Sequence, residues 1–196
     1  MTNFEYLHKY FSERITLNDR DTEIIFSLFK EINFKKEDFF LRQNEVCDQL
    51  GFVCKGIFRY YIEDDGDEQT YNFAMEGDFI CNYESMIRCS PSSKHIQAIE
   101  TSEVLIISRQ HLEKFYLEIR EGNLFGRIHM ENVYADTIRQ LVSHYTETPE
   151  MRYLKFLKKY PELNQRIPQY YIASYVGVKP QSLSRIRKRL TTKPIY

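Results

Sequence analysis

The sequence contains no apolar run long enough to cross a membrane, and its first residues lack the apolar core of a secretory signal peptide. Its four cysteines, Cys47, Cys54, Cys81 and Cys89, are widely spaced and form no CxxC pair. Zinc-binding and thioredoxin-type sites are therefore not expected, and the thiols are expected to stay reduced in the cytoplasm. A nucleophile elbow, an HExxH motif, a Walker loop and a glycine fingerprint are also missing, which argues against an enzyme.

Acidic residues are nearly missing from the C-terminal quarter. Residues 151–196 contain eleven lysines and arginines and a single acid, Glu162, for a net charge of +10. Residues 1–150 contain 16 basic and 27 acidic residues, for a net charge of −11. A basic module on an acidic body is typical of proteins that bind a phosphate backbone. With 196 residues, of which 42% are hydrophobic, the chain fits one or two globular domains.

One basic stretch, Ile172 to Leu190 (IASYVGVKPQSLSRIRKRL), predicts two short helices joined by a tight turn. Gly177 interrupts the first helix, as a residue that tolerates positive φ would. Pro180 suits the first position of a second helix, where the backbone N–H is not needed. Leu183, Ile186 and Leu190 then form one buried stripe, and the opposite face carries amide, hydroxyl and basic groups without an acid.

Two interpretations fit this helix pair. It is either a DNA-binding helix-turn-helix or an ordinary amphipathic helical hairpin with a solvated face. The basic charge of the same region favours DNA binding.

The N-terminal 33 residues are predicted to be helical. Phe4, Leu7 and Phe11 share one side of a first helix. A second helix is expected to begin at residues 18–21, where Asn18 precedes acids of the first turn. Its apolar stripe is expected to comprise Ile24, Ile25, Leu28, Phe29 and Ile32.

Residues 34–108 change to short segments rich in aromatic and β-branched residues. The Asp65-Gly66 pair between two such segments predicts a β-hairpin. Because the acidic run 63–68 lacks the spacing of an EF-hand loop, it is interpreted as a solvated hairpin tip. Residues 95–100 and 104–108 are expected to form a second strand pair. The region thus predicts a small antiparallel roll or barrel.

From about Glu121 to Tyr145 a long helix without proline is expected. Two roles remain open for it, a homodimer stalk or a helix packed on its own sheet. A break at Thr148-Pro149 precedes a further helix that ends near Pro161. An imperfect heptad seam runs along the long helix through Leu124, Ile128, Glu131, Ala135, Ile138 and Val142.

This order of modules resembles the Crp/Fnr family of bacterial transcription factors. The stretch Ile172 to Leu190 looks like the family's helix-turn-helix, and Gly77-Asp78-Phe79-Ile80 resembles the turn that opens its phosphate-binding cassette. The resemblance implies an α+β fold. Residues 1–120 would be a β-roll effector domain, 121–146 a dimerisation helix, and 147–196 a DNA-binding domain with a vestigial wing after the last helix. A homodimer, double-stranded DNA and RNA polymerase are the implied partners, and a cytoplasmic location is implied as well.

On the second helix of the pair, the family's base-reading positions fall on Pro180, Gln181 and Arg185. Arg185 would pair with guanine and Gln181 with adenine, whereas Pro180 cannot donate a hydrogen bond. The residues that would contact phosphates are Lys179, Ser182, Ser184, Arg187, Lys188 and Arg189.

The effector site departs from the family pattern. The Gly-Glu pair of cyclic-nucleotide binders is replaced by Cys81 and Asn82, and the Arg-Ser pair by Ser92 and Ser93. Because serine cannot replace the cation that a buried phosphate needs, cyclic AMP is not expected to be the effector. The candidate pocket comprises Gly77, Asp78, Asn82, Tyr83, Glu84, Ser85, Ser92, Ser93, Lys94 and, on the long helix, Thr137.

Cofactor-based sensing finds little support in the sequence. Residues 1–46 contain no cysteine, which argues against the iron–sulfur type of sensor. Lone histidines are more often structural than haem ligands, so no cofactor or metal is expected. The histidines through which haem sensing stays open in principle are His95, His111, His129 and His144.

The sequence therefore predicts a homodimeric, sequence-specific transcription regulator whose β-roll senses an unidentified effector. The alternative is a small-molecule receptor whose basic C-terminal module makes protein or nonspecific nucleic-acid contacts.

Overall fold

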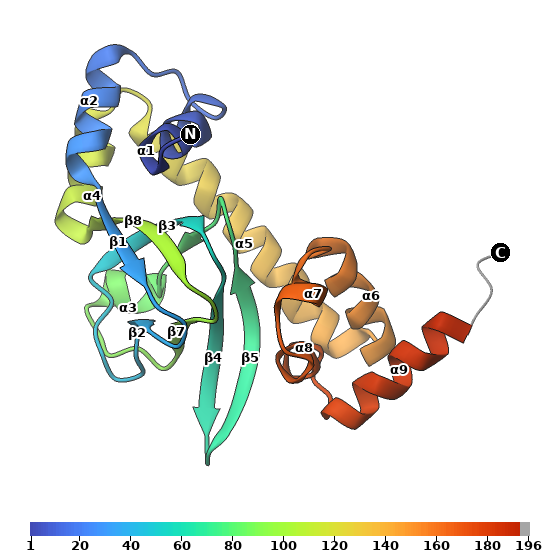
Figure 1. Ribbon diagram of the computed structural model, residues 1–196. Coiled ribbons are helices and arrows are strands. Elements are labelled where there is room, and N and C mark those ends of the chain that lie inside the picture. Colours follow the sequence, from blue (N-terminus) through green and yellow to red (C-terminus); the bar gives the residue numbers. More distant parts are fainter. Residues whose placement is uncertain (193–196) are drawn as a thin grey trace. The chain divides into compact units, whose positions relative to one another are not determined.

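The computed structural model describes residues 1–192 and forms two compact units (Figure 1). The first unit comprises Met1–Ile62 and Asn72–Tyr134, and the second comprises Glu63–Tyr71 and Ala135–Tyr196. Residues 193–196, within the segment predicted to be a vestigial wing, lie outside the described residues. Among the helices of residues 1–192, none is both long and apolar enough to cross a bilayer.

Two capped helices open the first unit. Helix α1 (Asn3–Ser12) begins after Thr2, and α2 (Asp19–Leu28) begins after Asn18. Both starts are capping boxes, in which the side chain before the helix and the third helical side chain satisfy each other's backbone N–H groups. The predicted helix start at residues 18–21 is therefore confirmed.

The prediction that the helical stripe extends to Ile32 is wrong. Helix α2 ends at Leu28, Phe29 is extended, and strand β1 (Lys30–Phe34) follows. Ile32 lies opposite Val104 in the sheet and is 41% exposed, so it does not belong to a buried helical face. A sheet partner distant in sequence overrides the local helical spacing here.

Two four-stranded sheets form the roll (Figure 1). Their strand orders are β1-β8-β3-β6 and β2-β7-β4-β5. Phe52, Phe58, Ile96 and Leu105 are completely buried in its core. The strands after β1 are β2 (Phe39–Leu41), β3 (Gln49–Lys55), β4 (Phe58–Asp64), β5 (Asp67–Ala74), β6 (Phe79–Ile80), β7 (His95–Ala98) and β8 (Ser102–Ser108).

Strands β7 and β8 form where the sequence predicts them, but they do not pair with each other. Strand β7 pairs with β2 and β4, whereas β8 pairs with β1 and β3 in the other sheet. The expected second strand pair is therefore wrong. Alternating apolar residues identify a strand but not its partner.

The Asp-Gly hairpin between β4 and β5 is confirmed. Asp65 and Gly66 both have positive φ, 49° and 83°, as the tight turn that matches strand twist requires. Residues 62–69 are exposed, so the acidic tip is solvated as predicted. Within the second unit the hairpin contacts α8 (Gln169–Val176): the Ser174 hydroxyl donates to the carbonyl of Glu68 and accepts from the N–H of Thr70.

Three helices follow or interrupt the strands. They are α3 (Tyr83–Arg88), α4 (Arg109–Glu118) and the 25-residue α5 (Gly122–Thr146). Near the start of α5, Phe125 packs against Phe11 and Phe115 of the first unit. Further along, Ile138, Leu141 and Val142 are 40–52% exposed. Helix α5 therefore carries an uncovered apolar stripe within one chain.

The second unit is built from the C-terminal helices. Helix α6 (Pro149–Lys159) begins at the predicted break, with Thr148 as its cap. It places Tyr153 and Phe156 in a core with Tyr160 and Leu163, each at most 4% exposed. A short helix, α7 (Leu163–Arg166), was not predicted. Helices α8 and α9 (Pro180–Thr192) complete the unit.

Candidate nucleic-acid interface and effector pocket

Gly177 ends α8 in the left-handed conformation, with φ of 78° and ψ of 39°. Its N–H and that of Val178 donate to carbonyls of the last turn of α8, which closes the helix end. The chain re-enters helix at Pro180, whose fixed φ suits that position. The predicted pair of helices joined by a glycine turn is therefore present. Gly177 ends the first helix and Pro180 begins the second, as expected.

Apolar burial fixes the two helices. Ile172, Ala173 and Val176 of α8 are completely buried, and Leu183 and Ile186 of α9 are 1% and 4% exposed. Fully burying side chains of this size stabilises by about 1.5–3 kcal/mol each. Leu190, the third residue of the predicted stripe, is only partly buried. Leu183 and Ile186 therefore hold α9, and its other face is left to solvent.

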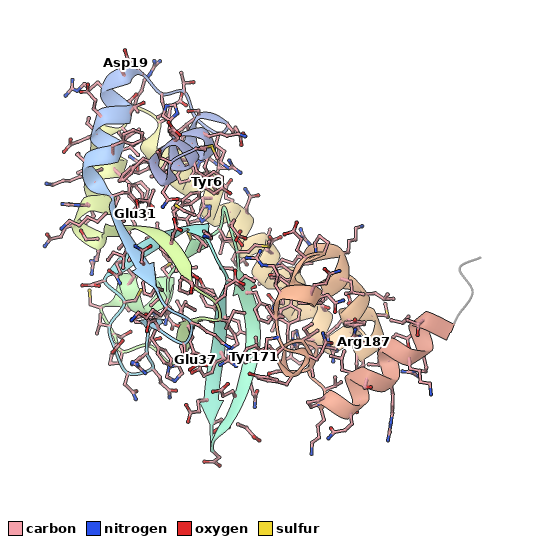
Figure 2. The ribbon with its side chains drawn as sticks, viewed as in Figure 1. Tyr6, Asp19, Glu31, Glu37, Tyr171 and Arg187 are labelled. Carbon is pink, nitrogen blue, oxygen red and sulfur yellow. The ribbon has the colours of Figure 1, made fainter. Side chains whose placement is uncertain are left out.

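The predicted DNA-binding residues lie on that solvent face. All are exposed except Arg187, which is intermediate and is labelled in Figure 2. No acid occurs within α9. One acid does reach this surface: Glu150 of α6 lies 3.3 Å from a guanidinium nitrogen of Arg189. The exposed residues are Lys179, Pro180, Gln181, Ser182, Ser184, Arg185, Lys188 and Arg189.

The sequence did not identify Arg152 as a positioning residue. Its Nε donates to the Val176 carbonyl at 2.8 Å, and its Nη1 donates to the Glu147 carbonyl at 2.6 Å. Arg152 therefore ties α6 to the C-terminal end of α8 and to the connection after α5. An arginine three residues into a predicted helix gives no sign that it will donate to a carbonyl 24 residues away.

The turn that resembles the phosphate-binding cassette is formed in the first unit. Gly77 has a φ of 88°, and the Asp78 carboxylate accepts from the N–H of Met75 at 3.0 Å. Asn82 caps α3 and is 3% exposed, whereas Tyr83 and Glu84 are exposed. Cys81, in the position of the family's glycine, has its thiol pKa raised to about 12 by burial, so it stays protonated.

Two of the side chains predicted to replace the family's ligand-binding pairs, Asn82 and Ser92, hydrogen bond to each other. The Asn82 amide donates to the Ser92 hydroxyl at 2.8 Å. That hydroxyl also accepts from the N–H of Lys94 and donates to the Lys94 carbonyl. A serine hydroxyl has one donor and two acceptor positions, so Ser92 is saturated. Both residues are at most 3% exposed.

Ser85 extends this buried network. Its hydroxyl accepts from the N–H of Cys47 at 2.9 Å and donates to the Ser90 carbonyl at 2.6 Å. The Asn82 N–H in turn donates to the Cys47 sulfur. The structure thus brings Asn82, Ser85 and Ser92 together as a closed network. Ser93 is exposed, Lys94 is partly exposed, and Thr137 belongs to the second unit.

The histidines considered for haem binding have protein contacts. His95 stacks on Tyr61 with ring centroids 4.7 Å apart, and His111 Nδ1 lies 3.1 Å from the Leu28 carbonyl. His129 stacks on Phe125, and burial lowers the pKa of its imidazole. His144 lies 3.0 Å from the carbonyl of Gln140. Among the described residues, no three His, Cys, Asp or Glu side chains are grouped so that they could hold a metal.

Residues 31–119 match the family model of the cyclic nucleotide-binding domain. A comparison with curated protein sequences finds no match.

Solved structures of similar fold cover most of the chain. FixK2 from Bradyrhizobium japonicum is 19% identical with a TM-score of 0.68, and the alignment covers 84% of this chain and 85% of that one. The c-di-GMP-responsive global regulator CLP from Xanthomonas campestris is 16% identical with a TM-score of 0.68, over 89% and 92% of the two chains. A transcriptional regulator of the Crp/Fnr family from Eubacterium rectale is 17% identical with a TM-score of 0.66, over 89% and 84%.

These findings confirm the resemblance that the sequence suggested. Residues 31–119 are similar to the cyclic nucleotide-binding domain, and the chain has the fold of the Crp/Fnr family of regulators.

Proposed function

We propose that the protein is a sequence-specific DNA-binding transcription regulator that acts as a homodimer on a palindromic site. The observation that carries this proposal is the exposed face of α9. It presents amide, hydroxyl and basic groups without an acid of its own, on a helix fixed by the Gly177 turn and a buried stripe. Such a helix fits the major groove. The fold shared with Crp/Fnr regulators supports the same reading.

The residues of α9 and the preceding Lys179 divide by role. Gln181 and Arg185 lie one turn apart near the N-terminal end and would read adenine and guanine edges. Lys179, Ser182, Ser184, Arg187, Lys188 and Arg189 would contact phosphates, which fix the register of the helix without reading sequence. Pro180 cannot donate to a base, so the half-site would differ from that of family members with arginine at this position.

The apolar stripe of α5 supports the homodimer. Leu124, Ile128, Ile138 and Val142 belong to a seam that, with Glu131 and Ala135, recurs at spacings of three and four, and these four apolar residues are 39–51% exposed. Glu131 interrupts the seam, but its carboxylate lies 2.6 Å from an Arg127 nitrogen on the same helix. In this proposal residues 1–120 are the sensor, 121–146 the dimer helix and 147–196 the DNA-binding domain. RNA polymerase would be the further partner of a bound dimer.

Titration of the protein against a palindromic DNA library, by fluorescence anisotropy at moderate salt, tests this function. Arg185→Ala is expected to relax specificity at one base position by about 1–3 kcal/mol. The matched control Lys188→Ala removes an exposed cation one turn further along α9. It is expected to weaken binding to all DNA sequences alike.

Two results would contradict the proposal. One is wild-type binding no tighter to any palindrome than to random DNA. The other is an equal loss of affinity for all DNA sequences in Arg185→Ala, which would favour a receptor whose basic module makes nonspecific contacts.

For the sensor domain, we infer that cyclic AMP is not the effector. The Ser92 hydroxyl, saturated by its hydrogen bonds, stands where the cyclic phosphate would need a cation, and the neutral Asn82 amide stands where the ribose hydroxyl would need a carboxylate acceptor. A thermal-shift titration with cyclic AMP is therefore expected to leave the melting temperature unchanged. A ligand at about a hundredfold excess over its Kd would stabilise the fold by about 2.7 kcal/mol, so a shift of several degrees would refute this inference.

A further inference from the structure

The second unit contains a cavity of about 300 Å³ that is not part of the α9 surface or of the cassette. Its walls are the C-terminal half of α5, one side of α6, and Tyr175 of α8. This volume is at the lower end of the range for small-molecule sites. No residue of α9 lines it.

Basic side chains converge on this cavity. Arg152, Lys155 and Lys159 follow one another at spacings of three and four, which places them on one side of α6. Arg139 and His144 reach it from α5. The single acid in the lining is Asp136.

Two carboxylates offset part of this charge. Asp136 lies 2.6 Å from Arg139, and Glu147 pairs with Lys155. The hydrogen bond from Lys155, with one from Ser143, lowers the pKa of the Glu147 carboxyl, so it is ionised at neutral pH. Four permanent cations, Arg139, Arg152, Lys155 and Lys159, therefore line the cavity, and the carboxylates of Asp136 and Glu147 pair with two of them.

Two further groups are preorganised. The Arg152 guanidinium is held by the carbonyls of Val176 and Glu147 through Nε and Nη1. Burial raises the pKa of Tyr175 to about 12, so its hydroxyl is a neutral hydrogen-bond donor. A fixed guanidinium, lysine ammonium groups and a phenol donor are the groups that bind phosphate oxygens.

We propose that this cavity binds a small phosphate-bearing molecule. A duplex cannot enter a cavity of this size, and the helix best suited to DNA does not line it, so a small ligand fits better than a DNA backbone. The ligand would bridge α5, α6 and α8, the helices on either side of the connection at Glu147. It would therefore act on the helix-turn-helix from within the second unit, outside the β-roll. Binding of the phosphate itself does not rest on the proposed DNA function.

The test is calorimetric titration of the full-length protein, without DNA, with inorganic phosphate, pyrophosphate and ATP, against sodium chloride at matched ionic strength. At least one phosphate probe is expected to bind saturably. Lys159→Gln is expected to weaken that binding about tenfold or more, because a charge-assisted contact is lost. Lys158→Gln removes the same charge from the neighbouring, non-lining position and is expected to change the affinity less than about twofold.

Two outcomes would overturn the proposal: no saturable binding of any phosphate probe, or equal losses of phosphate affinity from Lys158→Gln and Lys159→Gln. Circular dichroism of both variants confirms that each is folded, which is expected since both lysines are exposed. Because the titration contains no DNA, a failure of specific DNA binding would leave its result unaffected.

Discussion

Substitution of Gly56 by alanine is expected to destabilise the first unit by about 2–6 kcal/mol, through backbone strain and overpacking of about 1–3 kcal/mol each. Gly56 has a φ of +102°, and a Cβ there would lie 2.1 Å from the Ser102 hydroxyl oxygen and 2.8 Å from the Ser102 Cα. Ser102 is completely buried at the start of β8, so its backbone cannot yield cheaply. Since a domain's stability is about 5–15 kcal/mol, this loss is a large share.

Gly66→Ala is the matched control for this substitution. Gly66 also has positive φ, +83°, but a Cβ there meets nothing within 4 Å. The left-handed backbone conformation alone is therefore expected to lower the free energy of unfolding of Gly66→Ala, by about 1–2 kcal/mol. Urea unfolding of both variants measures the difference between their free energies of unfolding. Equal losses of stability in the two variants would show that the close approach of Ser102 has no energetic consequence.

Ile138→Asp is expected to convert the proposed dimer to a monomer. Ile138 is 40% exposed in the single chain and lies in the apolar stripe of α5, so a dimer would bury the introduced carboxylate without a partner. A monomer contacts one half-site only. Its affinity for a palindromic site should therefore fall by about 10³-fold, toward the nonspecific level. Sedimentation velocity and an anisotropy titration measure the two effects.

The control for this variant is Asn132→Asp. Asn132 is exposed on the same helix, about 120° around it from Ile138, so the added charge falls outside the stripe. This variant is expected to remain dimeric and to bind DNA nearly as wild type does. A dimeric Ile138→Asp protein would place the dimer contact elsewhere than on this stripe.

Local chemistry made the C-terminal helix pair predictable from sequence. Gly177 and Pro180 act through their own backbone preferences, so both ends of the turn could be located without a structure. The stripe of Leu183 and Ile186 depends only on helical spacing. The Asp65-Gly66 turn was predictable for the same reason, because its dihedral angles are set by the two turn residues.

Features that depend on distant partners could not be predicted. Ile32 has helical spacing from Leu28, but its position is set by Val104 across the sheet. Likewise, nothing near β7 or β8 indicates that their partners lie in different sheets. The role of Arg152 also depends on a carbonyl supplied by another helix.

The effector site falls between these cases. The sequence predicts that Cys81, Asn82, Ser92 and Ser93 replace the Gly-Glu and Arg-Ser pairs of cyclic-nucleotide binders. It does not show that Asn82 and Ser92 would then hydrogen bond to each other, because the two residues are ten positions apart on separate elements. The basic cavity of the second unit was missed because its cations come from α5 and α6 and meet only after folding.

The ion pair between Glu150 and Arg189 bears on how the proposed DNA complex would respond to ionic strength. Duplex DNA holds condensed counterions, and a protein cation that neutralises a phosphate releases them, which makes affinity fall as salt rises. Arg189 carries a carboxylate 3.3 Å from its guanidinium, so the pair together is neutral and displaces few of these ions. Binding would therefore be less steeply salt-dependent than the number of basic residues on α9 implies.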